Sequence, residues 1–368
     1  MLGRDKISPN KDLLYSSIKN NVVLITGGGG SIGSELCRQI INLEPKKLII
    51  MDLSEEKLYL ISQEFINNDN IEVLLGNAVD MNYLDYIFSY YNVDVIFHAA
   101  SYKHVPIVES NPLQGLKNNV FSTLAVCKAA YFNDIKKVIL ISTDKAVRPT
   151  NVMGASKRLA EIIMQTFAVS PAYFVDDGKE SKTAFSMVRF GNVLDSSGSV
   201  VPLFRKQISI GGPITLTHKK INRFFMTIPE ASELVIQASS LAKGGDVFLL
   251  DMGDPVYIFD LAEKMIRLSG LTVKSDQKLD GDIEIKVTGL RPGEKLYEEL
   301  IINAESEKTI HPLIYRAKEE ITKMEELSNK INYLEHYINS NNRNDSLKIL
   351  SELVPEWKNN YIGYLNKK

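Results

Sequence analysis

Residues 22–33 read VVLITGGGGSIG, an apolar run followed at once by four glycines and the start of an amphipathic stretch. This is the TGxxGxxG spacing, in which glycine permits a tight turn, close approach of the backbone to a pyrophosphate, and close packing of a helix on a strand. The first amides of that helix would face the ligand, together with the positive end of the helix dipole. The stretch therefore predicts a strand, a phosphate-binding turn and a helix, with five candidate cofactor contacts: Gly27, Gly30, Ser31, Ile32 and Gly33.

Short apolar runs alternate with amphipathic stretches from residue 21 to residue 143. After the first run come KKLIIMD, IEVLLGN, VDVIFHAA and KKVILIST. Runs of this length, rich in β-branched residues and separated by helical patterns, are typical of parallel strands that are buried on both faces. We predict an α/β fold: a Rossmann-like doubly wound parallel sheet with a smaller α+β C-terminal lobe that binds the substrate.

The regular alternation ends near residue 192, where clusters of glycine and proline begin. We expect an N-terminal segment (1–20), an NAD-binding Rossmann domain (21–192) whose sheet later segments complete, a substrate lobe (193–317) and a helical C-terminal extension (318–368). The extension is polar, so we expect it to be solvated or to contact another subunit of a homo-oligomer.

The composition is that of an ordinary globular protein, with 44% hydrophobic and 24% charged residues. The 43 basic and 45 acidic residues give a net charge of −2, which predicts neither a nucleic-acid partner nor binding to an anionic membrane. No run reaches the roughly 18 apolar residues of a membrane span, and the N-terminus lacks the apolar core of a signal peptide. Cys37 and Cys127 lie in apolar stretches without metal-ligand spacing, so we expect buried free thiols. We predict a soluble, cytoplasmic chain with no metal site.

Asp52 ends the second apolar run, 19 residues beyond Gly33. A carboxylate at this place can accept hydrogen bonds from the adenosine ribose and would repel a 2′-phosphate, which favours NAD over NADP. The segments GNAVD (76–80) and HAAS (98–101) follow the next two runs, at the carboxyl ends where the ligand crevice of such a sheet opens. They supply four further candidate cofactor contacts: Asn77, Ala78, Ala99 and Ala100.

Six features follow one another in a set order: TGGGGSIG (26–33), Asp52, HAASYKHVPIVE (98–109), STDKAVRPTNVMGASK (142–157), RFGNV (189–193) and LRPGEK (290–295). Together they resemble the nucleotide-sugar 4,6-dehydratases of bacterial polysaccharide and glycoprotein biosynthesis, a branch of the extended short-chain dehydrogenases/reductases. The resemblance covers roughly residues 2–302. The UDP-N-acetylglucosamine 4,6-dehydratase group is the most similar in type.

The chain departs from the superfamily at one place. A YxxxK pair usually supplies a catalytic tyrosine and a lysine that holds the nicotinamide ribose, and here the pair is Met153 and Lys157. The spacing keeps both side chains on one helix face, but a thioether cannot exchange a proton. Some dehydratases of this family have Met at this place, mostly large forms with N-terminal membrane helices. The chain is thus expected to be a short form, or the soluble part of a membrane-anchored form.

The resemblance implies removal of a hydride from C4 of the sugar, elimination of water across C5 and C6, and return of the hydride to C6. In this chemistry Asp144 would protonate the C6 oxygen, and Lys145 would take the C5 proton. The C4 hydroxyl would give its proton to Thr143, Asp144 or a bound water, since Met153 cannot accept one.

The resemblance also implies contacts with the substrate. Lys103 and His104 would lie beside the sugar. Arginine matches the oxygens of a diphosphate with its planar fork of donors. The candidate contacts to the nucleotide diphosphate are Asn192, Arg205, Arg223, Arg291 and Glu294.

We therefore expect NAD-dependent conversion of UDP-N-acetylglucosamine to a UDP-2-acetamido-2,6-dideoxy-4-keto-hexose, with the C5 configuration retained. A nucleotide-sugar epimerase shares fold and cofactor, but Asp144 and Lys145 and the missing tyrosine argue against it. A non-catalytic dinucleotide sensor would explain Met153, but the retention of Asp52, Lys157 and the Asp144–Lys145 pair argues against it.

Overall fold

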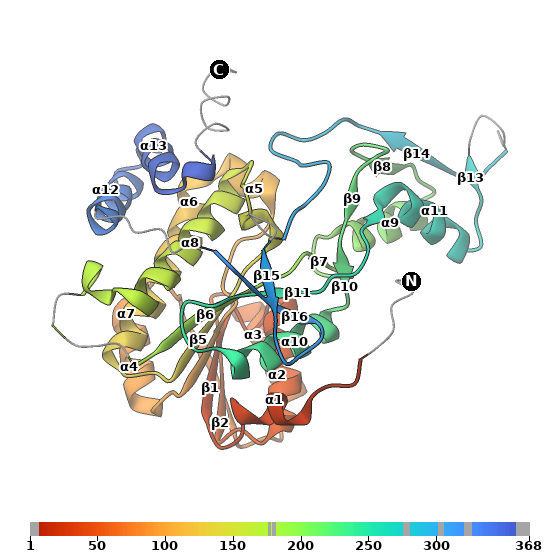
Figure 1. The fold of residues 1–368 in the computed structure, drawn as a ribbon. Helices are drawn as coiled ribbons and strands as arrows, with labels where there is room; N and C mark the ends of the chain where they lie inside the picture. Colours follow the sequence, from red (N-terminus) through yellow and green to blue (C-terminus); the bar gives the residue numbers. More distant parts are fainter. Residues whose placement is uncertain are drawn as a thin grey trace.

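The computed structural model describes residues 7–175, 178, 182–274, 280–300, 305–319 and 326–357. Within these residues the strands build a nine-stranded sheet in the order β15-β16-β11-β6-β5-β4-β1-β2-β3 (Figure 1). Seven of its strands are mutually parallel: β1 (Val22–Thr26), β2 (Lys47–Asp52), β3 (Ile71–Leu75), β4 (Val95–His98), β5 (Lys137–Ile141), β6 (Ala184–Arg189) and β11 (Val247–Leu250). Two antiparallel strands complete one edge: β15 (Ser306–Lys308) and β16 (Ile314–Ala317).

The strand order reverses beside β1. The chain proceeds outward through β2 and β3, then returns to place β4 on the other side of β1. In such a sheet, ligands bind outside the carboxyl ends of the strands at this reversal. The predicted doubly wound sheet is confirmed.

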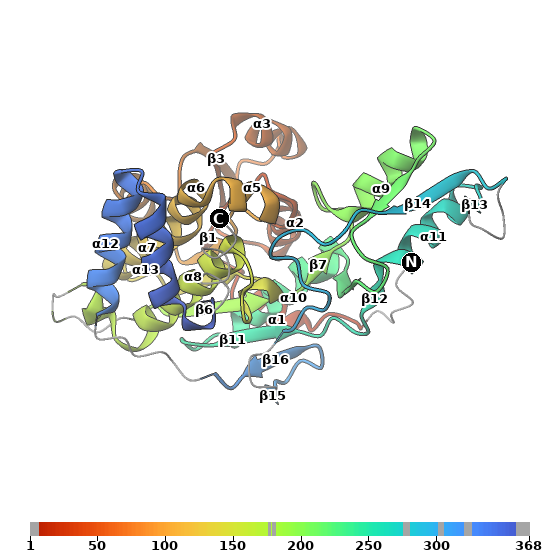
Figure 2. The same cartoon turned by 90° about the horizontal axis from the view of Figure 1, so that it is seen from above.

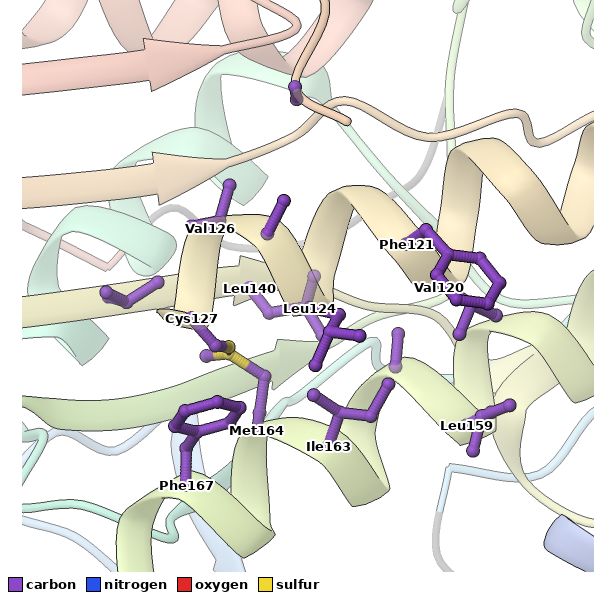
Figure 3. Close-up of a cluster of buried hydrophobic side chains, with 14 of the residues drawn as sticks. Val120, Phe121, Leu124, Val126, Cys127, Leu140, Leu159, Ile163, Met164 and Phe167 are labelled. Atoms are coloured by element: carbon purple, nitrogen blue, oxygen red, sulfur yellow. The ribbon is translucent and has the colours of Figure 1, made fainter. Parts of the chain in front are cut away.

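Helices cover both faces of the sheet and enclose a hydrophobic core on each. One face carries α4 (Met81–Tyr91), α7 (Ser122–Phe132) and α8 (Val152–Val169). The other carries α1 (Lys11–Ser16), α2 (Ser31–Ile40), α3 (Glu55–Glu64) and α10 (Ile228–Leu241). Figure 3 shows the packing of α7 on α8, where the thiol of Cys127 contacts the sulfur of Met164 at 3.2 Å. Cys37 and Cys127 are buried and free, as predicted.

A separate lobe extends from one side of the sheet (Figure 2). It has its own apolar core, to which Phe204, Phe225 and Ile266 belong. Its elements are β7 (Asn192–Val193), α9 (Val200–Ser209), β8 (Ile214–Leu216), β9 (Asn222–Arg223), β10 (Phe225–Met226), β12 (Val256–Tyr257), α11 (Ile258–Leu268), β13 (Val273–Lys274) and β14 (Ile283–Val287). The segment expected to form the lobe (193–317) is interrupted, because α10, β11, β15 and β16 return to the large sheet.

The C-terminal helices α12 (Leu327–Asn339) and α13 (Arg343–Leu353) form a hairpin on the side away from the lobe (Figure 2). Their apolar residues, among them Leu334 and Leu350, join the core on the α8 face. The hairpin packs against α8 and α6 (Pro112–Leu116), which α5 (Val105–Ser110) precedes. The expectation of a solvated extension is therefore wrong for these residues, since one apolar stripe on each helix is buried. In the described part of the chain, no helix combines the length and apolar character of a membrane span.

Candidate active site

A cavity of about 770 Å³ opens at the carboxyl ends of β1, β4 and β5 and continues into the lobe. Its size lies in the upper part of the usual range for small-molecule sites. Sixteen of the predicted site residues line it: Gly27, Gly30, Ser31, Ile32, Gly33, Ala99, Lys103, His104, Thr143, Lys145, Met153, Lys157, Asn192, Arg223, Arg291 and Glu294. Six lie outside its lining: Asp52, Asn77, Ala78, Ala100, Asp144 and Arg205.

The glycine turn between β1 and α2 is packed too closely for side chains. Gly27 has a φ of +70°, and a Cβ atom there would lie 2.7 Å from the backbone nitrogen of Ala100. A Cβ on Gly33 would lie 2.1 Å from the carbonyl oxygen of Gly27. The turn thus needs glycine for the left-handed conformation and for the approach of α2 to β1, which is the arrangement that dinucleotide sites require.

Asp52 is fixed beside this turn. Its two carboxylate oxygens accept hydrogen bonds from the backbone N–H groups of Gly29 and Ser54, each at 2.9 Å. Asn77 accepts a bond from the N–H of Val79, and Ala78 is buried. Asp52 thus holds the glycine turn in shape, while its contact with a ribose stays a prediction.

Lys57 lines the same end of the cavity and was missed by the sequence analysis. Its Cβ lies 2.5 Å from the place that a Cβ on Gly29 would take. No motif marks Lys57, because it follows two glutamates on an ordinary amphipathic helix, α3.

Helix α8 presents Met153 and Lys157 to the cavity from its first turns. The ammonium of Lys157 donates to the carbonyl oxygen of Ile141, at the end of β5, at 2.7 Å. Burial lowers the pKa of Lys157 to about 8, with Glu161 acting in the opposite direction. The N–H of Val152, at the start of α8, donates to Glu109, so this carboxylate caps the helix rather than reaching the cavity. Met153 is 2% exposed and offers no exchangeable proton.

Asp144 and Lys145 follow β5 in a short 3-10 turn and contact each other. The Lys145 ammonium donates to Asp144 Oδ1 at 2.9 Å and to Asn192 Oδ1 at 3.1 Å. The Thr143 hydroxyl donates to the same Asp144 oxygen at 2.8 Å. Asp144 is fully buried, and its Oδ2 has no hydrogen-bond partner among the described residues. Thr143 and Lys145 are thus both hydrogen-bonded to the same carboxylate oxygen of Asp144.

The charge on Lys145 depends on its neighbours. Burial pulls its pKa down, but Asp144 and then Glu298 more than offset this and hold the pKa above its ordinary value. Glu298 was not among the predicted site residues. Its carboxylate lies 3.9 Å from the Lys145 ammonium, on the segment that follows LRPGEK, where the next residue, Glu299, is exposed. The sequence offers two adjacent glutamates there and no signal that selects the buried one.

The substrate residues proposed from the sequence occupy different surroundings. Arg223 lines the cavity, but its guanidinium donates to the backbone carbonyls of Asn222, Lys295 and Leu296 at 2.6 to 3.2 Å. It thereby anchors the segment that follows Arg291 to strand β9.

Arg205 points elsewhere. Both of its terminal nitrogens bond to Asp195, at 3.0 and 3.2 Å, in an exposed ion pair outside the cavity. The structure does not bring Arg205 to the site, because the residues of α9 that face the cavity are Val200, Leu203 and Phe204.

The lobe contacts the sheet domain at two places beside the cavity. The imidazole of His104 packs against Gly198, which has a φ of +68°, so that a Cβ there would lie 2.4 Å from the ring. The N–H of Ser197, in the same turn, donates to the Ser31 hydroxyl at 3.2 Å. The lobe thus contacts both the glycine turn and the loop after β4. On the lobe side, Glu294 accepts from the Thr217 hydroxyl and from the N–H of Arg291, each at 3.1 Å.

Comparison with known proteins places this arrangement in a family. A family model described as "Polysaccharide biosynthesis protein" matches residues 23–319. The chain belongs to this family. The capsular polysaccharide biosynthesis protein CapD of Staphylococcus aureus is 44% identical over 86% of this chain and 51% of CapD. The probable polysaccharide biosynthesis protein EpsC of Bacillus subtilis is 46% identical over 82% of this chain and 48% of EpsC. The chain spans about half the length of these two relatives.

Other family relatives match along nearly their whole length. A UDP-glucose 4-epimerase of Rickettsia bellii is 31% identical over 91% of this chain and 95% of the epimerase. Among solved structures, Pen from Bacillus thuringiensis is 36% identical, with a TM-score of 0.73, over 83% of this chain and 92% of Pen. The dTDP-glucose 4,6-dehydratase DesIV of Streptomyces venezuelae, solved with NAD, is 17% identical with a TM-score of 0.64 over 76% of this chain and 88% of DesIV, and shows the shared fold. The expected membership of a polysaccharide biosynthesis family is confirmed, and these matches do not separate a dehydratase reaction from an epimerase reaction.

Proposed function

We propose that this protein catalyses the NAD-dependent 4,6-dehydration of a nucleotide sugar for surface glycan synthesis, with UDP-N-acetylglucosamine as substrate and retention at C5. One observation carries the proposal: an acid and a base, Asp144 and Lys145, lie side by side, with Lys145 lining the cavity and Asp144 buried in contact with it. Elimination of water needs such a pair, one to take the C5 proton and one to protonate the leaving hydroxyl. Hydride transfer alone, as in epimerisation, does not.

NAD bound at the glycine turn would supply hydride chemistry at C4 and C6. The chain's own residues manage the protons. Thr143 takes the proton of the C4 hydroxyl and passes it to Asp144, to which its hydroxyl already donates. Asp144 then gives this proton to the C6 oxygen as water leaves. In this way one proton moves from the first hydroxyl to the second without a tyrosine, which explains how the site works with Met153.

The transfer of the C4 proton to Asp144 also prepares Lys145 to act as a base. As long as Asp144 is a carboxylate, it holds the pKa of Lys145 high. Once Asp144 has accepted a proton, its negative charge is gone and burial lowers the pKa of the amine. Lys145 can then lose its proton to water in the cavity and act as the base at C5. The C5 proton therefore leaves only after oxidation at C4 has made it acidic.

Incubation with UDP-N-acetylglucosamine in deuterated water, followed by NMR of the product, tests the proposal. A dehydratase converts C6 to a methyl group and places solvent deuterium at C5. Epimerisation, the second candidate because near full-length relatives carry the name UDP-glucose 4-epimerase, inverts C4 and keeps the C6 hydroxyl without solvent label. Unchanged UDP- and dTDP-sugars would favour a non-catalytic sensor.

A further inference from the structure

Glu298 is a buried carboxylate next to the proposed catalytic pair, on the side of Lys145 that does not line the cavity. Its side chain is 4% exposed. Its Oε1 lies 3.9 Å from the Lys145 ammonium and 3.7 Å from Arg223 Nε. Its Oε2 has no hydrogen-bond partner among the described residues. A buried carboxylate oxygen without a partner is costly, so its retention here calls for a reason other than packing.

The position of Glu298 is fixed by its neighbours. Arg223 binds the carbonyls of Lys295 and Leu296, two and three residues before Glu298. Lys295 in turn donates to the carbonyl of Val147, two residues after Lys145. The segment carrying Glu298 is therefore joined by hydrogen bonds to β9 and to the turn that carries Lys145, which keeps the carboxylate within a few ångströms of the ammonium.

The hydrogen bonds of the Lys145 ammonium do not use all of its N–H groups, so a further negative group can act on its charge. An ammonium has three N–H groups, and two of them bond to Asp144 and Asn192. The charged groups that face Lys145 are Asp144 and Glu298, both acidic, and Arg223, which is basic. Of the two carboxylates, only Asp144 changes charge in the proposed reaction. Glu298 thus contributes a constant negative charge beside the base.

We propose that Glu298 is a positioning residue that sets the protonation equilibrium of Lys145 from behind the reacting centre, an inference that rests on the proposed dehydration. A negative charge at this distance favours the ammonium over the neutral amine. When Lys145 has taken the C5 proton, Glu298 stabilises the resulting cation, so that the proton stays available for return to the same face of C5. Retention at C5 follows from this arrangement.

The shift in the pKa of Lys145 has the direction that this proposal requires. Glu298 raises the pKa of Lys145. Burial and then Asp144 raise the pKa of Glu298 itself, while Lys145, Arg223 and Lys295 oppose this rise. Each partner therefore acts on the charge of the other.

The test is the pH dependence of dehydration by the NAD-loaded protein with Glu298→Gln, compared with Glu299→Gln, whose glutamate is exposed and pairs with Arg148. Without the carboxylate, Lys145 should lose its proton at lower pH in the enzyme–substrate complex, so the acid limb of kcat should move by about 1 to 3 pH units toward acid. Glu298→Asp keeps the charge and should keep the wild-type pH profile, even if its rate falls. Glu299→Gln should match the wild type. Thermal unfolding and NAD binding confirm that each variant is folded.

The results separate the two proposals. If the wild type dehydrates and Glu298→Gln loses rate equally at all pH values, or has an unshifted acid limb, Glu298 is a structural residue and the inference is wrong while the proposed function stands. A Glu298→Gln variant that does not fold leaves the decision to Glu298→Asp, in which an acid limb displaced from that of the wild type also overturns the inference. If the wild type forms no 6-deoxy product, both proposals are wrong, because Lys145 then has no C5 proton to take.

Discussion

Two clusters of buried charge lie near the ends of the neighbouring strands β5 and β6, and they differ in whether their hydrogen bonds are complete. In the first, which we call the Arg189 cluster, Arg189, Glu161, Arg158 and Glu319 are nearly inaccessible to solvent. Both oxygens of Glu161 accept bonds from Arg189, and they also accept from Ser142 and Arg158. Both oxygens of Glu319 accept bonds from arginines.

The second cluster, which we call the Lys145 cluster, contains Asp144, Lys145, Arg223 and Glu298. It is buried to a similar degree, apart from Lys145, whose side chain is 21% exposed. Here one oxygen of Asp144 and one of Glu298 have no hydrogen-bond partner among the described residues. A complete network rigidifies a core, whereas unpaired polar atoms at a cavity mark groups that await a ligand or a proton. We infer that the Arg189 cluster holds the fold and the Lys145 cluster performs the chemistry.

The largest effect is expected in the Lys145 cluster. Lys145→Met should stop elimination while leaving hydride removal from C4 possible, so solvent deuterium should not enter C5. Asp144→Asn should slow both hydride removal from C4 and the loss of water, because an amide can neither accept the C4 proton from Thr143 nor donate a proton to the C6 oxygen. Each change should lower the rate of dehydration about 10² to 10⁴-fold in protein that thermal unfolding shows to be folded. Losses of only a few-fold would contradict these roles.

Substitutions in the Arg189 cluster should lower the stability of the folded protein. Arg189→Met leaves Glu161 and Glu319 buried without their main cation, which should lower the free energy of unfolding by about 3 to 5 kcal/mol in urea titrations. The control is Arg205→Met, which removes an exposed ion pair and should change this free energy by less than about 1 kcal/mol. Equal changes in the free energy of unfolding for the two substitutions would contradict the structural role of the Arg189 cluster.

The pH dependence of stability follows from the same cluster. Although burial acts in the opposite direction, Arg189 and Arg158 lower the pKa of Glu161 from 4.5 to about 2. A lowered pKa in the folded state means that the stabilisation is complete above pH 4.5 and is lost as the pH falls toward 2. Urea titrations across this interval should show the loss in the wild type and a smaller slope in Glu161→Gln.

A moderate effect is expected at the cofactor end. Asp52→Ala removes the support of Gly29 and the predicted hydrogen bonds to the ribose, so NAD affinity measured by calorimetry should fall about 10-fold or more. The preference for NAD over NADP should shrink as well, because the charge that would repel a 2′-phosphate is gone. Tighter binding of NADP than NAD by the wild type would contradict the prediction.

The smallest effect is expected at Met153. If Thr143 and Asp144 already accept the C4 proton, Met153→Tyr should bring no more than a few-fold change in dehydration rate, and the added ring has little room at a position that is 2% exposed. A large rise in rate would show that the native site lacks a route for this proton.

The parts of this account that could be predicted are those that local pattern specifies. The glycine spacing and the apolar runs predicted the parallel strands and the position of the cofactor turn. Later segments were expected to complete the sheet, but β15 and β16 could not be assigned to its edge, because these strands are only three and four residues long and β15 is exposed. The C-terminal hairpin was misjudged because its polar composition conceals one buried stripe on each helix.

Side-chain direction limited the prediction of the site. Arg205 was selected for its charge, yet it lies on the outer face of α9. Glu298 was overlooked beside the exposed Glu299, because the segment after LRPGEK is irregular and gives no periodicity from which to infer which side chain is buried. Which of two adjacent residues faces a site is decided by contacts with distant segments, here with Arg223 and Lys145.

The central claim is that this site moves hydrogen from C4 to C6 of one sugar with loss of water. UDP-N-acetylglucosamine carrying deuterium at C4 tests it most directly, with mass spectrometry and NMR of the product formed in ordinary water. The account predicts that deuterium appears in the C6 methyl group of a 4-keto sugar. Deuterium that remains at C4 of a sugar still bearing its C6 hydroxyl would contradict it.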